Sequence, residues 1–144
     1  MTGIDLIKEQ IRIAAGKKLS YRQQDVRIGG HAIECRINAE NPKEQFRPSP
    51  GLITDVYFPG GKGVRIDTAV YNGYEVPAYY DSMLAKLIVY AKTRKEAISK
   101  MRSALGEVII EGVDTNVDYQ YEIMNHPDYQ AGNVDIEFIS EKMC

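Results

Sequence analysis

The chain has 144 residues, the usual size of a single domain, and folding is expected to remove roughly two-thirds of its surface from water. Its 18 basic and 20 acidic residues give a net charge of −2 without long blocks of either sign, which argues against nucleic-acid and membrane-surface binding. The longest apolar run, 87–91, is far shorter than the roughly 20 residues of a membrane span. The chain has no signal segment, and Cys35 and Cys144 are too few for a disulfide framework, so the cytoplasm is the expected compartment.

The first predicted element is a short amphipathic helix. We expect Thr2 to cap it, with Asp5 three residues later, and Gly16 to end it. Apolar side chains recur along it at helical spacing, at Ile4, Ile7, Ile11 and Ala15. Because this apolar face has no preceding element to pack on, we expect a segment upstream of Met1 to be missing from the sequence.

Strands are predicted in the next part of the chain. Apolar and polar residues alternate over 31–40 and over 52–58, as is typical of half-buried strands. A further strand is expected over 63–68, and the glycines before it predict a hairpin with strand 52–58. Residues 83–90 are apolar on both faces except for Lys86, a pattern that indicates a strand near the middle of a sheet.

The next segment carries the clearest helix signal. Thr93 and Glu96 have the spacing of a capping box, in which each side chain bonds the backbone N–H of the other residue. The helix is expected to end near Gly106. Its predicted buried stripe consists of Ala97, Ile98, Met101, Ala104 and Leu105.

The last third of the chain continues with an apolar segment, 108–110, and further helices. Either Asp114 or Thr115 can cap a helix that stops before Pro127, and a last amphipathic segment covers 135–143. Strands dominate the first two-thirds and helices the C-terminal third. The sequence therefore predicts an α+β fold, with a largely antiparallel sheet and helices packed on one of its faces.

Few residues of the chain are typical metal ligands or nucleophiles. His31 and His126 lie far apart in the sequence, and no motif of closely spaced His, Cys or acidic ligands accompanies them, so no metal site is predicted. His31 is interpreted as a satisfied strand residue. Cys35 alternates with isoleucines, which favours a small buried side chain over a reactive thiol.

Three further features leave a structural and a functional interpretation open. The glycines of 60–63 resemble part of a phosphate-binding loop, but they join two strands, which favours a tight hairpin turn. Arg65 shares a strand face with Asp67, so spacing alone makes it a solvated residue or half of a weak surface ion pair, with a functional role as the alternative. The polar-aromatic cluster 79–82 fits either an interface or the edge of a core.

Several long motifs occur together and in order along the chain. They read G-I-D-L-I-K-E-Q-I-R-I-A-A-G, G-H-A-I-E-C-R-I-N-A-E, P-S-P-G, G-V-R-I-D-T, G-Y-E-V-P-A-Y-Y-D-S-M-L-A-K-L-I and, over 111–117, E-G-V-D-T-N-V. This set closely resembles the C-terminal domain of biotin carboxylases over nearly the whole chain.

The resemblance implies a ligase activity in the intact enzyme. With Mg-ATP, bicarbonate becomes carboxyphosphate, and the carboxyl group passes to the ureido nitrogen of biotin on a carrier protein. Deprotonation of that nitrogen leaves negative charge on the ureido oxygen, which a fixed guanidinium can stabilise. Arg65 matches the biotin-binding arginine of the family, so the resemblance makes it both the catalytic and the biotin-binding residue.

By the same resemblance, residues 1–144 form one C-terminal domain, and the N-terminal and ATP-grasp domains are absent. The glycine-rich ATP loop and the nucleotide, metal and bicarbonate ligands then precede Met1, so the fragment is expected to bind no cofactor and to be inactive alone. Its expected partners are the remainder of the carboxylase chain and the biotin carboxyl carrier protein. The intact enzyme is expected to be a homodimer, with a contact around Tyr90 and Arg94.

Other functions remain as alternatives. The domain could serve only as a structural or dimerisation module, with Arg65 incidental, or as a free-standing biotin-binding protein, which a single arginine supports poorly. The sequence does not identify the acyl acceptor. Because the end at Cys144 resembles the end of a stand-alone subunit, bacterial acetyl-CoA carboxylase, an enzyme of fatty acid biosynthesis, is the first choice.

Overall fold

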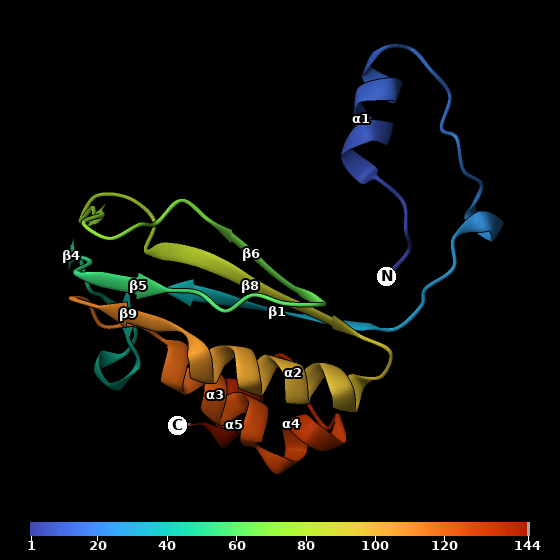
Figure 1. Cartoon of the computed structure of the whole chain (residues 1–144). Coiled ribbons are helices and arrows are strands. Elements are labelled where there is room, and N and C mark those ends of the chain that lie inside the picture. Colours follow the sequence, from blue (N-terminus) through green and yellow to red (C-terminus); the bar gives the residue numbers. More distant parts are fainter. Residues whose placement is uncertain (144) are drawn as a thin grey trace.

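A three-stranded antiparallel sheet with the order β1-β8-β6 forms the centre of the protein (Figure 1). The structure is a computed structural model that describes residues 1–143, so Cys144 lies outside the described residues. The three strands are β1 (His31–Asn38), β8 (Met83–Ala91) and β6 (Val64–Thr68). Val89 on β8 lies opposite Ile33 on one side and Val64 on the other, which confirms the prediction that this strand lies in the middle of a sheet.

The remaining strands form short two-stranded pairs. These are β2 (Glu40–Asn41) with β3 (Arg47–Pro48), β4 (Gly51–Leu52) with β7 (Glu75–Val76), and β5 (Asp55–Tyr57) with β9 (Ile109–Glu111). The predicted hairpin between strands 52–58 and 63–68 is therefore wrong. The backbone of β5 is hydrogen-bonded to β9, and that of β6 to the central strand β8.

The glycine-rich loop 60–63 is consequently a connection between two sheets rather than a tight hairpin turn. The Lys100 ammonium donates to the carbonyl oxygens of Lys62 and Tyr90, each at 2.9 Å, and the Tyr90 N–H donates to the Gly63 oxygen at 2.8 Å. Gly63 has φ of 78°, and a Cβ there would lie 2.6 Å from the Tyr90 oxygen. Only glycine fits this close approach, which fixes the loop at the start of β6.

Helices α2 and α3 cover one face of the sheet (Figure 1). The helical segments are α1 (Leu6–Ala14), η1 (Gln23–Asp25), η2 (Pro42–Glu44), α2 (Arg94–Glu107), α3 (Val117–Asn125), α4 (Pro127–Ala131) and α5 (Phe138–Lys142). The capping box of Thr93 and Glu96 at the start of α2 is confirmed. Antiparallel strands followed mainly by helices on one face also confirm the predicted α+β fold.

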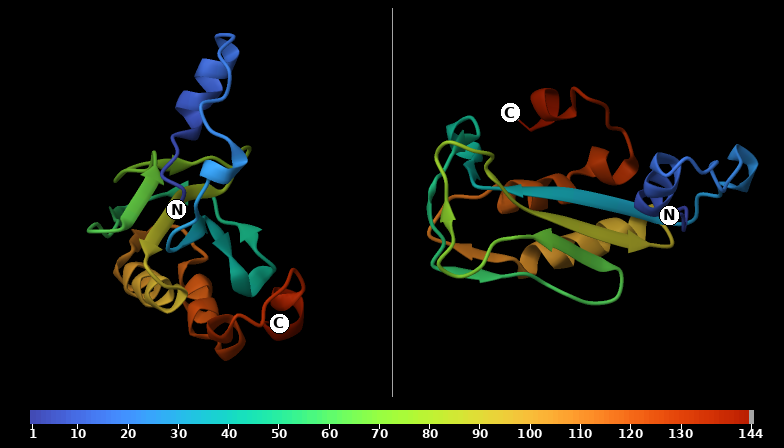
Figure 2. Two further views of the ribbon diagram at one scale, coloured as in Figure 1. Left: turned by 90° about the vertical axis from the view of Figure 1, so that its right-hand side faces the viewer. Right: turned by 90° about the horizontal axis from the view of Figure 1, so that it is seen from above.

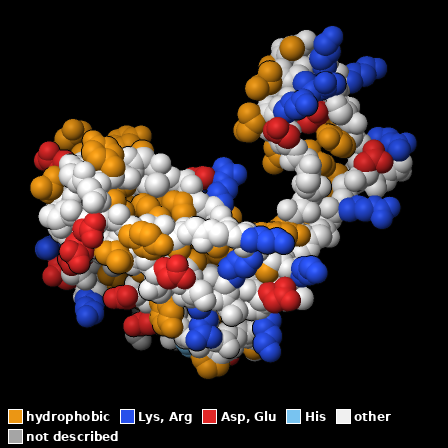
Figure 3. Space-filling model, in the orientation of Figure 1, with side chains coloured by type: hydrophobic (Ala, Val, Ile, Leu, Met, Phe, Trp, Pro, Cys, Tyr) orange, Lys and Arg blue, Asp and Glu red, His pale blue; other side chains and the backbone are white. Residues whose placement is uncertain are grey.

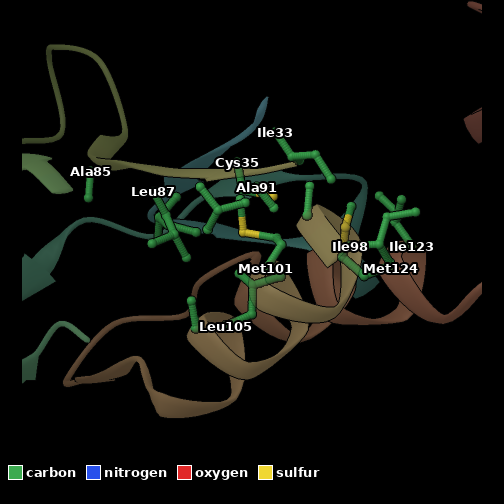
Figure 4. Packing of buried hydrophobic residues seen from close by; sticks show 14 of the residues in the cluster. Ile33, Cys35, Ala85, Leu87, Ala91, Ile98, Met101, Leu105, Ile123 and Met124 are labelled. Carbon is green, nitrogen blue, oxygen red and sulfur yellow. The ribbon is translucent and has the colours of Figure 1, made fainter. Parts of the chain in front are cut away.

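The main core lies between this sheet face and the helices (Figure 4). The buried stripe of α2 consists of the five predicted residues, Ala97, Ile98, Met101, Ala104 and Leu105. Against it pack the inward side chains of β1 and β8, among them Ile33, Cys35, Ile37, Leu87 and Val89. Burial, with a further contribution from Glu34, raises the pKa of the Cys35 thiol to about 12. The thiol is therefore a small core group rather than a nucleophile.

The caps of two helices differ from the prediction. Asp5, not Thr2, caps α1, and its carboxylate accepts a hydrogen bond from the Lys8 N–H at 2.9 Å. The Thr2 hydroxyl instead accepts from the Ile4 N–H outside the helix. A carboxylate next to the positive end of the helix dipole explains the preference for Asp5.

The cap of α3 is Asn116 rather than Asp114 or Thr115, and its side chain makes no capping bond. The amide oxygen of Asn116 accepts from the Asn38 N–H at 2.9 Å, and its amide nitrogen donates to the Arg36 carbonyl at 3.1 Å. The side chain is buried, so it satisfies two backbone groups of β1 and joins α3 to the sheet.

The N-terminal segment, residues 1–30, projects from the rest of the protein (Figures 1 and 2). Four apolar side chains of α1 are between 50% and 67% exposed, namely Leu6, Ile7, Ile11 and Ile13, and apolar atoms are visible along this segment in Figure 3. Glu9 is the buried residue of the helix, and its carboxylate accepts from the Ser20 N–H at 3.0 Å. This bond ties α1 to the chain that returns from it. Within residues 1–143, no helix has the length and apolarity needed to span a bilayer.

Candidate functional site on the uncovered sheet face

The centre of the sheet face opposite to α2 and α3 carries two rows of outward side chains that cross all three strands. Alternation along each strand sends every second residue to this face, and the strand register places the outward residues side by side. The rows across β1, β8 and β6 are Glu34, Ile88 and Arg65, and next to them Arg36, Lys86 and Asp67. The helices thus bury one face of the sheet and leave a face with five charged side chains open.

Arg65 lies on β6, one of the two edge strands of the sheet, and projects from this open face. Its Nε donates to Oδ1 of Asp67 at 2.8 Å, and its Nη2 donates to Oδ2 at 3.0 Å. Such a two-point contact is the strongest geometry that an arginine and a carboxylate adopt. The Arg65 side chain nevertheless remains 73% exposed, so the pair stands in solvent. The structure therefore has the ion pair that the sequence allowed.

The electrostatics of the pair follow from these contacts. Hydrogen bonds from Arg65 are the main reason that the pKa of the Asp67 carboxyl lies below its ordinary value of 3.8. Desolvation opposes this lowering of the pKa, and the charges of Arg65 and Lys86 add to it to a lesser extent. The pKa of Arg65 is raised, first by its hydrogen bonds to Asp67. Both groups are thus charged at neutral pH.

The guanidinium of Arg65 has donors to spare. It carries five N–H groups, and Asp67 uses one on Nε and one on Nη2. Within residues 1–143, no hydrogen bond uses Nη1. The edge formed by Nη1 and the second N–H of Nη2 can therefore donate to an oxygen of a bound molecule. An open hollow of about 320 Å³ is bordered by Asp67 and Lys86, on the side of Asp67 that continues into Thr68.

Tyr90 and Arg94, the expected dimer contact, lie at the junction of β8 and α2. Tyr90 is 44% exposed, and its hydroxyl donates to the Gly29 carbonyl at 3.3 Å. Arg94 donates through Nη2 to the Tyr129 carbonyl at 2.6 Å, and its guanidinium lies 4.9 Å from the centre of the Tyr129 ring. Arg94 is thus bound to α4 of its own chain, whereas Tyr90 presents part of its ring to solvent.

Within residues 1–143, no hydrogen bond or ion pair joins the other residues considered from the sequence to Arg65. Tyr79 and Tyr80 are 92% and 82% exposed, so the two tyrosines of the cluster 79–82 are not part of the edge of a core. Ser82, by contrast, is half-buried, and its carbonyl accepts from the N–H of the buried Ala39 at 2.7 Å. His126 caps α4, and its Nδ1 accepts from the Asp128 N–H at 3.2 Å. Across residues 1–143, no three potential His, Cys, Asp or Glu ligands gather as a metal site would require.

Sequence reasoning missed Lys86 as a neighbour of Asp67, and it missed the bridging role of Asn116. Lys86 was visible as the one polar residue in an apolar strand, and that signal marks an outward position. Its neighbour depends on the register between β6 and β8, which alternation alone does not give.

Comparison with known proteins gives consistent matches over the chain. The sequence model of the family described as "Biotin carboxylase C-terminal domain" matches residues 34–141. A biotin carboxylase of Allochromatium vinosum is 53% identical over 143 residues, which are 99% of this chain and 31% of that protein. A pyruvate carboxylase subunit of Methanothermobacter thermautotrophicus is 51% identical over 141 residues, which are 98% of this chain and 29% of that protein.

A solved structure agrees with these matches. It is the biotin carboxylase domain dimer of the Hydrogenobacter thermophilus 2-oxoglutarate carboxylase, in complex with MgADP, ADP and bicarbonate. The two chains superpose with a TM-score of 0.93 at 48% identity, and the match covers 97% of this chain and 31% of that one. The present chain thus spans about a third of the length of the curated relatives it matches.

Proposed function

Because the chain belongs to the family of biotin carboxylase C-terminal domains, we propose that residues 1–144 are the C-terminal domain of an ATP- and bicarbonate-dependent biotin carboxylase. The N-terminal and ATP-grasp domains of the enzyme are outside this sequence. The relatives are about three times as long, which supports this division. In this proposal the chain completes the biotin site and does not carry out the reaction alone.

The observation that carries the proposal is the free edge of Arg65. Carboxylation of biotin requires loss of the proton on the ureido nitrogen, and negative charge then builds up on the ureido oxygen. A guanidinium that is already in position stabilises this charge as it develops, without waiting for solvent to reorganise. The Nη1 edge of Arg65, exposed on a rigid strand and charged at neutral pH, has the donors that this oxygen needs.

In this proposal the binding sites for Mg-ATP and bicarbonate lie in other parts of the enzyme. Among residues 1–143 no cluster of acidic ligands is available for a metal–nucleotide complex. We therefore propose that the remainder of the carboxylase chain binds both. The Hydrogenobacter domain, which is three times as long, was solved with MgADP and bicarbonate, in support of this assignment.

The proposed partners are the biotin carboxyl carrier protein, the remainder of the carboxylase chain and a second copy of the enzyme. The Hydrogenobacter biotin carboxylase domain was solved as a dimer, which supports a homodimer here. In this proposal the exposed ring of Tyr90 contributes to the contact, and Arg94 supports it from its place beside α4.

For the acyl acceptor we propose acetyl-CoA, and hence a cytoplasmic role in fatty acid biosynthesis. The biotin carboxylase of Allochromatium and the pyruvate carboxylase protein of Methanothermobacter resemble this chain almost equally, at 53% and 51% identity. Sequence identity alone therefore hardly distinguishes acetyl-CoA from pyruvate as the acyl acceptor. Carboxylation assays with acetyl-CoA and with pyruvate, using the complete enzyme system, distinguish them.

The decisive experiment replaces Arg65 by alanine in the full-length carboxylase. We expect biotin carboxylation to fall by about 100-fold or more, the usual cost of one oxyanion donor, with unchanged thermal unfolding because the side chain is exposed. The matched control is Arg47→Ala, which removes another exposed arginine that forms an ion pair, with Glu44 at 2.9 Å, and should leave the rate unchanged. The 144-residue chain alone should show no bicarbonate-dependent ATP hydrolysis.

A different result would favour a purely structural role. If Arg65→Ala left the rate unchanged, or reduced it only by unfolding the protein, the domain would serve as a structural or dimerisation module. Activity in the isolated chain would show that the catalytic machinery had been misplaced.

A further inference from the structure

The proposed reaction assigns no part to Asp67, yet Asp67 binds the guanidinium of Arg65, which has one. We infer that Asp67 is a positioning residue, which fixes the guanidinium of Arg65 so that its Nη1 edge meets the ureido oxygen of biotin. This inference rests on the proposed function of Arg65. It concerns the direction in which the guanidinium points, which the identity of the arginine alone leaves undetermined.

The contact between the two residues constrains the whole head group of Arg65. Nε is the guanidinium nitrogen nearest to the main chain, and Asp67 binds both it and Nη2. Two parallel hydrogen bonds fix the plane of the group as well as its position. The free edge then points away from the carboxylate. An exposed arginine without such a partner would be distributed over many rotamers.

The strand makes this constraint rigid. Arg65 and Asp67 are two residues apart on β6, so both side chains leave the same face of the sheet. Hydrogen bonding to β8 fixes both positions, with Arg65 opposite Ile88 and Asp67 opposite Lys86. The Thr68 hydroxyl also donates to the Leu84 carbonyl at 2.7 Å, which holds the end of β6 next to Asp67.

The neighbours of the pair leave Asp67 as the carboxylate best placed for Arg65. The residue directly across from Arg65 is Ile88, which offers no acceptor, and the next outward residue in that row is Glu34 on β1. Two strand spacings separate Glu34 from Arg65, roughly 10 Å between the backbones. Across from Asp67 stands Lys86, whose positive charge favours the ionised carboxylate.

The test is a double-mutant cycle in the full-length carboxylase, with kcat and KM measured for free biotin at saturating ATP and bicarbonate. Asp67→Asn should lower kcat about 10-fold with less than about a 3-fold change in KM, because the charge that Arg65 stabilises develops after binding. Asp67→Glu keeps both oxygens and should retain at least about half of kcat. Arg65→Ala with Asp67→Asn should match Arg65→Ala alone.

Glu44→Gln provides the matched control, because it disrupts the exposed pair with Arg47 and should leave kcat unchanged. The outcomes separate the inference from the proposed function. If Arg65→Ala has no effect, the proposed function fails, and the role of Asp67 fails with it. If Arg65→Ala lowers kcat but Asp67→Asn does not, or lowers it equally when Arg65 is already absent, only the positioning role is overturned.

Discussion

The two faces of the central sheet use the same strands in opposite ways. On one face, the side chains of β1 and β8 are buried against α2 and α3 and hold the fold together. On the other, the outward side chains of the same strands and of β6 form rows of charged groups around Ile88. Along one strand, residues that stabilise the core thus alternate with residues that are available for chemistry on the open face. A rigid site can be built in this way without a separate supporting element.

Substitutions of Leu87 and Ile88 test the difference between the two faces most directly, because these residues are neighbours on β8 and face opposite sides. Leu87 is fully buried in the core cluster, whereas Ile88 lies among charged residues on the open face. We expect Leu87→Ala to lower the free energy of unfolding by about 3 kcal/mol, and Ile88→Ala by about 1 kcal/mol. Urea unfolding of the 144-residue chain measures both. Equal losses would mean that the outward face is packed as well.

Asn116 provides a second way to sharpen the comparison, because it supports the sheet from the helix side through polar contacts alone. Its replacement by alanine leaves the Asn38 N–H and the Arg36 carbonyl without that partner in a partly buried region. We expect a loss of about 2 kcal/mol in the free energy of unfolding. Asn133, which is exposed, is the matched control, and its alanine variant should unfold with the wild type. A stable Asn116→Ala variant would show that water replaces the bridge.

Local signals explain what the sequence predicted well. The capping box and buried stripe of α2 lie within one helix, so residues 93–107 carry all the information required. Alternation likewise sorted the faces of β1, because a strand has a period of two residues. On the open face, the same rule placed Arg65 and Asp67 side by side. The candidate site was thus located from sequence, although its assignment to biotin came from the family resemblance.

Contacts between distant segments explain what the sequence missed. β5 pairs with β9, which follows more than 50 residues later, and alternation identifies strands without naming their partners. The cap of α3 was predicted at the wrong residue because the side chain of Asn116 bonds to β1 instead of to its own helix. Its partner there, the Asn38 N–H, is 78 residues away in the sequence. The bond between Arg65 and Asp67 depends on rotamers that spacing does not determine.

The titration of Asp67 is the smallest effect we predict, and it concerns the open face alone. Its folded-state pKa is depressed, so its favourable interaction with Arg65 is present above the ordinary pKa of 3.8 and is lost as the pH falls through the depressed value. Arg65→Ala should return the pKa of Asp67 toward 3.8, and Lys86→Met should raise it less, because the hydrogen bonds from Arg65 are the larger cause. Carboxyl ¹³C NMR of the chain follows both shifts.

Because the pair is exposed, neither variant should change the midpoint of urea unfolding at neutral pH appreciably. A larger shift with Lys86→Met would instead make the cross-strand lysine the main partner of Asp67, and the guanidinium of Arg65 would then be held less firmly than its two hydrogen bonds imply.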